Sequence, residues 1–131
     1  MLFHTMVGSN DIERSRQFYN AVLGALGVGE GATNVAGSGH IRVLYSNKGG
    51  TNFIVSQPIN DELATVANGS TVAFSCDSAE QVELFHATAL ANGGTSIEDR
   101  PGPRESAMGP INLAYVRDPD GNKLCGIHIP T

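Results

Sequence analysis

Two side chains stand out for the chemistry that they could perform, a histidine near the start of the chain and a cysteine near its end. His4 could donate a hydrogen bond to a ligand oxygen, act as a general base, or simply be a polar group on a cavity wall. Cys125 could be a nucleophile if its thiolate were stabilised, but the sequence places no His or Arg beside it. The expectation for Cys125 is therefore a buried, unreactive thiol, and Cys76 is expected to pack at a strand end.

A stiff segment with two arginines, Arg100-Pro101-Gly102-Pro103-Arg104, is the third feature with chemical potential. The two prolines restrict the backbone, and two guanidinium groups four residues apart could point the same way. Such a loop could bind a carboxylate or a phosphate, or it could be a rigid connector with solvated arginines. The sequence leaves both interpretations open.

Composition excludes several classes of protein. The chain has 131 residues, 13 of them acidic and 8 basic, and a net charge of -5, which argues against binding to nucleic acid. No apolar run approaches the roughly 18 residues that a membrane span needs. The first residues have no basic segment followed by an apolar stretch, so no secretory signal is expected. Two cysteines give no disulfide framework, and a cytoplasmic protein is predicted.

Two amphipathic helices must position these side chains. After Asn10, apolar residues recur at helical spacing up to Leu26, and Glu13 completes a capping box with Asn10. After Asp77 the same pattern recurs, with Glu80 in the place of Glu13. A single offset of 67 residues brings both boxes and three positions of the apolar stripe into register, which predicts an internal repeat.

Strand patterns follow each helix. Residues 40–46 and 51–57 alternate and end at Pro58, and residues 111–117 and 123–129 alternate and end at Pro130. Asp118-Pro119-Asp120-Gly121 between the last two strands is a strong turn signal. With short strands before each helix and weak ones after it, each half reads β-α-β-β-β. The prediction is an α+β domain of two tandem βαβββ modules, at about 1–58 and 70–130, with a connector at about 59–69.

The sequence resembles the glyoxalase / bleomycin-resistance / extradiol-dioxygenase superfamily, also called vicinal oxygen chelate proteins. The pieces that carry the resemblance are His4, the stretch DIERSRQFYNAVLG at 11–24, Val72-Ala73-Phe74, Ala91-Asn92-Gly93-Gly94 and Asp118-Pro119-Asp120-Gly121-Asn122-Lys123-Leu124. The resemblance implies two modules whose mixed sheets form a cupped surface, with each helix on the convex side. It also implies a homodimer whose cups are completed at or near the interface.

The resemblance further implies where a metal would be held, on the first and last strand of each module. His4 and, by the 67-residue offset, Thr71 occupy the first strands. Cys125 follows Asp-Gly-Asn-Lys-Leu on the last strand, and alignment of Pro58 with Pro130 puts Phe53 opposite it. One His and one Cys beside Thr and Phe do not provide the three or four donors of a transition-metal site. No metal or other cofactor is therefore expected.

Two functions remain. The first is a binding protein similar to the resistance members, which holds a small molecule in the cup without a metal. The second is a metal-dependent enzyme similar to lactoylglutathione lyase, a lyase or isomerase with His4 as its candidate catalytic residue. The orientations of His40, Arg42 and Tyr115 are not fixed by the pattern. The residues predicted to contact a ligand are His4, Met6, Phe53, Thr71, Arg100, Arg104, Tyr115 and Cys125.

Overall fold

The computed structural model describes residues 1–130, and these form two consecutive βαβββ modules. The first module consists of β1 (His4–Gly8), α1 (Ile12–Gly24), β2 (Ala32–Val35), β3 (Ile41–Tyr45) and β4 (Asn52–Ser56). The second module consists of β5 (Val72–Ser75), α2 (Ala79–Ala91), β6 (Thr95–Arg104), β7 (Ile111–Arg117) and β8 (Lys123–His128). The predicted fold class is confirmed.

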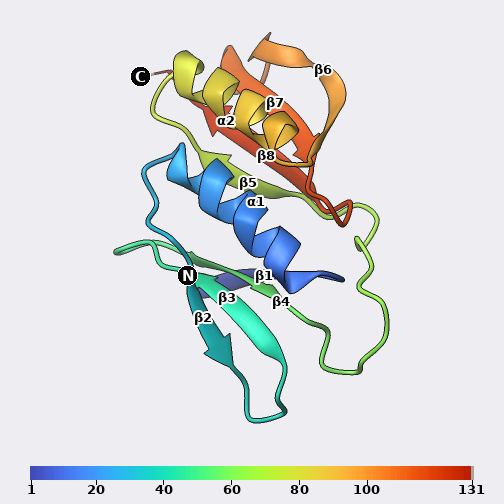
Figure 1. Ribbon diagram of the computed structural model, residues 1–131. Helices are drawn as coiled ribbons and strands as arrows, with labels where there is room; N and C mark the ends of the chain where they lie inside the picture. The colour runs from blue at the N-terminus through green and yellow to red at the C-terminus, as the bar shows by residue number, and fades with distance from the viewer. Residues whose placement is uncertain (131) are drawn as a thin grey trace.

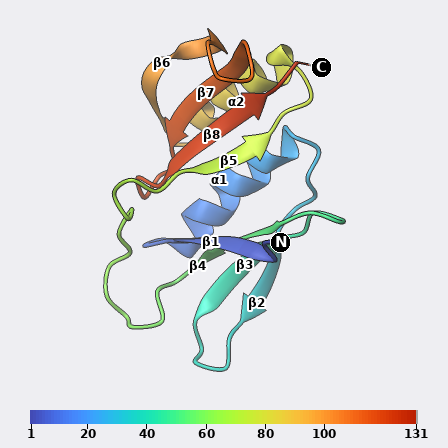
Figure 2. The same ribbon diagram turned by 180° about the vertical axis from the view of Figure 1, so that it is seen from behind.

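Each module contains one mixed sheet of four strands. The strand orders are β1-β4-β3-β2 and β5-β8-β7-β6, so the first strand of each module pairs in parallel with the last one. The remaining pairs are antiparallel. Both helices lie on the same side of the molecule (Figure 1), and the two sheets are seen without a covering helix from behind (Figure 2). Neither helix within residues 1–130 is long and apolar enough to cross a membrane.

The helix caps lie one residue later than the sequence pattern predicts. Asp11 caps α1 by accepting a hydrogen bond from the Arg14 backbone, and Ser78 caps α2 in the same way. Asn10 and Asp77 are therefore not the capping residues, because Asp11 and Ser78 supply the oxygen one position further on. In both modules the capping residue lies one position after the predicted one. Asp11 and Ser78 are therefore still 67 residues apart, and the correspondence between the modules is preserved.

One continuous core joins the modules. A chain of aromatic rings runs from Tyr19 to Phe53 in module one and on to Phe74 and Phe85 in module two, with centroid separations of 4.9, 5.3 and 6.3 Å. Such ring pairs add to the free energy of apolar burial. The buried core cluster comprises Phe18, Tyr19, Val22, Leu23, Val43, Tyr45, Phe53, Val55, Cys76, Val82, Phe85, Ala89, Ala114, Val116 and Leu124.

A buried carboxylate ties the two modules together. Asp118, in the turn after β7, is 3% exposed and accepts a hydrogen bond of 2.5 Å from the Tyr19 hydroxyl of α1. It also accepts from the backbone of Asp120 and from both the backbone and the side-chain amide of Asn122. Burial and the Asp118 charge raise the pKa of Tyr19 well above its ordinary value, so the hydroxyl remains a donor.

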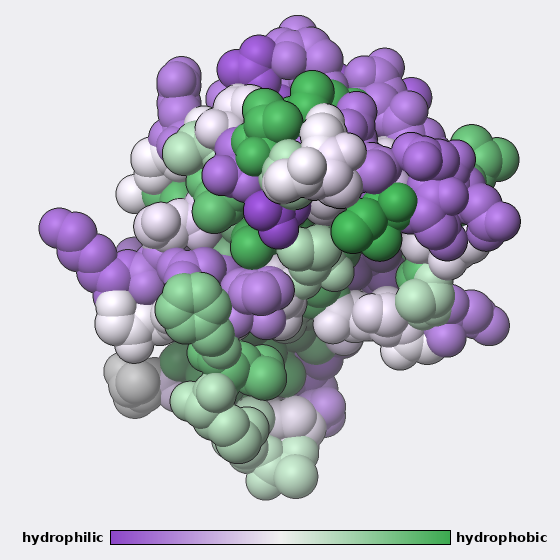
Figure 3. Space-filling view, turned by 90° about the horizontal axis from the view of Figure 1, so that it is seen from below, coloured by the Kyte–Doolittle hydropathy of each residue, from purple (hydrophilic) through white to green (hydrophobic). Residues whose placement is uncertain are grey.

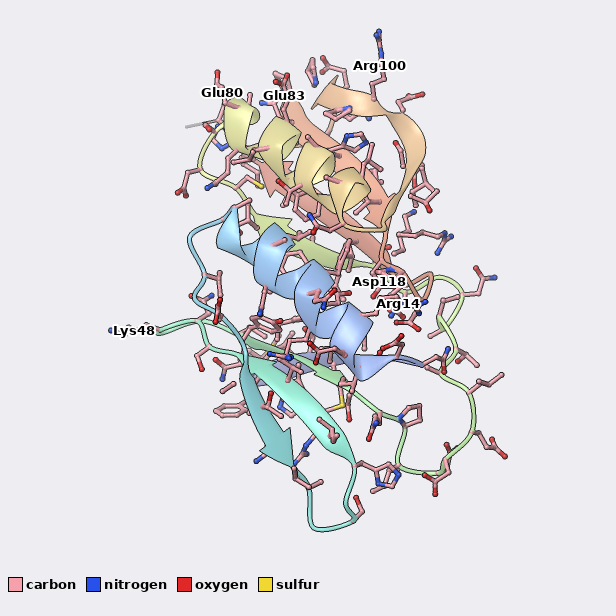
Figure 4. The ribbon with its side chains drawn as sticks, viewed as in Figure 1. Arg14, Lys48, Glu80, Glu83, Arg100 and Asp118 are labelled. Carbon is pink, nitrogen blue, oxygen red and sulfur yellow. The ribbon has the colours of Figure 1, made fainter. Side chains whose placement is uncertain are left out.

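The same turn reaches further into module one. The Asp120 carboxylate accepts hydrogen bonds from the Asn10 backbone, the Arg14 guanidinium and the Ser15 hydroxyl. The Asn122 amide donates to the Gly8 carbonyl at the end of β1. Figure 4 shows Asp118 and Arg14 close together where the two modules meet. The predicted turn is thus confirmed. Its Asp118 and the following Asn122 are buried, and their side chains connect the two modules.

Substitution of Asp118 should test this joint. In Asp118→Asn an amide replaces one acceptor oxygen, so at least one buried donor loses its partner. We expect the free energy of unfolding to fall by about 2 kcal/mol or more. Denaturant unfolding measures this loss. Asp99→Asn on the exposed part of β6 is the matched control and should change stability little; equal losses in both variants would contradict a special role for Asp118.

Candidate functional site

The open face of module one is the sheet surface opposite the helices. Strand partners share a face, so the register of His4 with Asn52 and of Met6 with Ile54 places these residues together on this surface. The pairing of Arg42 with Ser56 and of Leu44 with Ile54 extends it across β3. His4 and Met6 are exposed. The open face of module one is defined by His4, Met6, Arg42, Leu44, Asn52, Ile54 and Ser56.

Phe53 does not lie on this face, and its predicted place beside His4 is wrong. It pairs with Thr5 and Tyr45, and its ring packs in the core against Tyr19 and Phe74. The register of β4 follows from its hydrogen bonds to β1, in which Met6 pairs with Ile54 as Ala73 pairs with Cys125 in module two. The distance to the proline at the end of the strand does not determine it. The residue that corresponds to Cys125 is Ile54.

The open face of module two carries a compact polar cluster. Cys125 pairs with Ala73 on one side and with Tyr115 on the other, which places all three on one face. Lys123 lies on the same strand face and approaches the Tyr115 ring to 4.8 Å from its centroid. Thr71, two residues before Ala73, is exposed. The structure thus brings Tyr115 and Cys125 together on one face, whereas the sequence pattern had left the orientation of Tyr115 open.

Glu98 completes this cluster in a strained conformation. Its carboxylate lies 2.5 Å from the Lys123 ammonium. Its φ is 60°, in the left-handed region that residues other than glycine rarely adopt, and it lies within the register shift of β6 between Ile97 and Gly102. Nothing in the sequence pattern signals this bulge, so the ion pair was not predicted.

The two arginines of the expected loop are not brought together. Residues 95–104 form the strand β6, and the loop prediction is wrong because this segment pairs with β7 around a bulge. Arg104 donates to the backbone carbonyls of Asp99, Arg100, Gly102 and Pro103, so its guanidinium holds the bulge. Arg100 lies in the middle of β6, within its register shift, and its side chain points away from the molecule (Figure 4).

A pocket of about 600 Å³ lies on the open face of module one. Met6, Arg42 and Ser56 contribute from the sheet, and residues 57–65, with Ala36, Ser38 and His40, form the walls. Met6 is 44% exposed, and Ile59 and Leu63 in the wall are even more exposed. Figure 3 shows apolar side chains in an interrupted patch framed by polar ones on this end of the molecule.

The wall of this pocket is fixed to module one. The Asn10 side chain accepts from the Ala64 backbone amide at 2.8 Å and donates to its carbonyl at 3.5 Å. A Cβ at Gly8 would lie 2.8 Å from the Ala64 Cβ, so glycine permits the close approach of the wall to β1. His40 binds Asp61 of the wall through Nε2 at 2.8 Å. Sequence patterns gave no signal for these contacts, which join residues far apart in the chain.

A second pocket, of about 580 Å³, lies between the modules. Thr5, Phe53 and Asn52 line it from module one, and residues 71–75 line it from module two. Two of the predicted ligand contacts, Phe53 and Thr71, therefore share a pocket, but it differs from the one that Met6 lines. The other predicted contacts lie elsewhere: Tyr115 and Cys125 on the open face of module two, Arg100 and Arg104 on β6, and His4 on the open face of module one outside both pockets. The predicted contacts therefore do not form one site.

The side chains at the expected metal positions do not suit a metal. The positions that correspond across the modules hold His4, Ile54, Thr71 and Cys125, which offer one imidazole and one thiol. Among residues 1–130 no group of three or more His, Cys, Asp or Glu side chains is arranged to hold an ion. A transition-metal centre requires three or four strong donors, so these residues do not fit one.

Both thiols are held in their protonated form. Burial raises the pKa of Cys76 to about 11. Burial also raises the pKa of Cys125, and the neighbouring Tyr115 hydroxyl offsets only part of that effect. Because the thiolate is the reactive species, neither cysteine is arranged as a nucleophile at neutral pH.

Comparison with known proteins was made at the level of families and of solved structures. The family model described as Glyoxalase/Bleomycin resistance protein/Dioxygenase superfamily matches residues 1–125. A glyoxalase/bleomycin resistance protein from Albidiferax ferrireducens T118 is 48% identical, with a TM-score of 0.91 over 98% of this chain and 99% of that chain. No curated protein matches the chain.

More distant structures share the fold alone. A glyoxalase/bleomycin resistance protein/dioxygenase family enzyme from Burkholderia phytofirmans PsJN is 17% identical, with a TM-score of 0.69 over 98% of each chain. Glyoxalase I from Zea mays is 20% identical, with a TM-score of 0.72 over 96% of this chain and 45% of that chain.

The thiols give a pH-dependent prediction. Because the pKa values of both native thiols are raised, the thiolate fraction is small at pH 8 and grows with pH. In Cys125→Ser, which isolates Cys76, we expect labelling of native protein by a disulfide reagent to accelerate about tenfold per pH unit from pH 8 to 10. A free thiol with a pKa of about 8.5 instead levels off near pH 9. The same variant unfolded in guanidinium is the control. A native rate that levels off below pH 9 would contradict the assignment.

Proposed function

Because the chain belongs to the Glyoxalase/Bleomycin resistance protein/Dioxygenase superfamily, we propose that it binds a small molecule on the open face of module one, without a metal ion. The observation that carries this proposal is the pocket of about 600 Å³ between that face and residues 57–65. Its volume suits a small molecule.

The lining of the pocket supports a ligand with an apolar body. Met6 on the floor and Ile59 and Leu63 on the wall are large apolar side chains that remain exposed. Exposed apolar side chains that gather in one pocket, with polar side chains around them, are typical of a binding surface. The wall is held by Asn10, so the pocket exists before a ligand enters.

A metal-dependent glyoxalase-type enzyme is the second candidate function. The exposed imidazole of His4 on the open face favours it, since imidazole is a common metal ligand. The neighbouring strand positions argue against it, because Asn52 and Ile54 supply no strong donor beside His4. Binding without a metal is therefore the function that we favour, and a homodimer remains part of the proposal.

A neutral fluorescent probe tests the binding function. N-phenyl-1-naphthylamine has an aromatic body and no charge, and we expect its emission to increase and shift to the blue with the native protein. Met6→Asp should weaken this binding about tenfold or more, since a buried methionine side chain contributes about 1.5–3 kcal/mol. Leu84→Asp on α2 is the matched control, because Leu84 is 51% exposed and lies outside the pocket. Equal binding by Met6→Asp and the wild type would refute the site.

Metal analysis separates the two candidate functions. We expect protein purified without a histidine tag and dialysed against zinc, nickel or manganese to retain no stoichiometric metal. Chelator should leave probe binding and the midpoint of thermal unfolding unchanged. Stoichiometric metal that is lost in His4→Ala would overturn metal-free binding and favour the enzymatic alternative.

A further inference from the structure

Arg42 is the one guanidinium on the floor of the module-one pocket. Its position on β3, in register with Ser56 of β4, directs it to the open face, and it lines the pocket. Nη2 donates to the Asn34 side-chain oxygen on β2 at 2.9 Å, which orients the planar group. Nε is buried, and within residues 1–130 it has no hydrogen-bond partner.

A buried donor of a charged group without an acceptor is unusual in a folded protein. Buried polar groups are nearly always hydrogen-bonded, and a charged donor has the greatest need of a partner. Among residues 1–130 neither the Gln57 side-chain oxygen, which accepts from the Ile41 backbone, nor Asp61, which binds His40, accepts a hydrogen bond from Arg42 Nε. An acceptor from outside the chain would therefore complete the Arg42 site.

The charges around the pocket are arranged by depth. Asp61 and Glu62 are exposed on the wall, whereas Arg42 is only partly exposed and lies on the sheet. The Glu62 side chain is within 3.5 Å of the Asn60 amide, so it faces its own segment. The floor of the pocket thus carries a positive charge, with the apolar side chains of Met6 and Leu63 beside it.

From this arrangement we infer that the ligand is an organic anion with an apolar body. Its acidic group accepts from the guanidinium of Arg42, and its body packs on Met6, Ile59 and Leu63. Arginine suits this role because its planar guanidinium holds several N–H donors in a fixed arrangement that matches a carboxylate or a sulfonate. The inference rests on the proposed function and specifies the class of ligand.

Two dyes with the same aromatic body test the inference. 1-Anilinonaphthalene-8-sulfonate is anionic, and N-phenyl-1-naphthylamine is its neutral counterpart. We expect the wild type to bind the sulfonate at least about tenfold more tightly than the amine, the ratio typical of a charged hydrogen bond. Arg42→Gln should remove this preference while changing the affinity for the neutral dye less than about twofold. Arg42→Lys should keep part of it, since lysine preserves the charge and loses the fork.

Lys48→Gln is the matched control for charge. It removes the same unit of charge from module one, and Lys48 lies on a loop and points away from the molecule (Figure 4). We expect it to leave both affinities unchanged. Circular dichroism and thermal unfolding of each variant check that it folds, and a crystal soaked with the sulfonate dye should place a sulfonate oxygen within hydrogen-bonding distance of Arg42.

The outcomes separate the two proposals. Equal affinities of the wild type for both dyes, an equal loss of both in Arg42→Gln, or a loss of the sulfonate in Lys48→Gln would overturn the anion inference alone. A soaked crystal with the sulfonate away from Arg42 would overturn it as well. Failure of both dyes to bind would overturn the proposed function together with the inference.

Discussion

The fold depends on burying one carboxylate where its donors come from both modules. Asp118 belongs to the turn after β7, yet the Tyr19 hydroxyl of α1 must meet it. A buried charge without such partners is costly, so the first helix and the last hairpin can adopt only a narrow range of relative positions. Asp120 and Asn122 extend this constraint to the start of α1 and the end of β1. The apolar core forms between the sheets and the helices, and no helix covers the opposite faces of the sheets.

That asymmetry determines which side chains are available for binding. On the helix side the strands present aromatic residues that pack across the modules, and Phe53 is used there. On the other side, module one has a floor with Met6 and Arg42, whereas module two has an ion pair between Glu98 and Lys123. The two repeats therefore share a fold and differ in chemistry, which is why only the first offers a cationic pocket floor.

The fold and the family could be predicted because they depend on repeated local patterns, and both are confirmed. The site was less predictable. Phe53 was assigned to the wrong face because strand register is set by lateral hydrogen bonds, and an error of one residue reverses a side chain. The tie between Asn10 and Ala64 and the left-handed Glu98 depend on tertiary contacts that leave no periodic signal. Cys125 is buried as expected, although the charged groups of Lys123 and Glu98 lie near it, which the sequence did not indicate.

The wall of the module-one pocket is built from the segment that joins the repeats. Residues 57–65 include neither the buried joint at Asp118 nor the aromatic core, and Ile59, Glu62 and Leu63 are exposed. Substitutions in this segment can change the shape and charge of the pocket while the two repeats keep their packing. The shape of the pocket and the stability of the fold thus depend on separate stretches of the same chain.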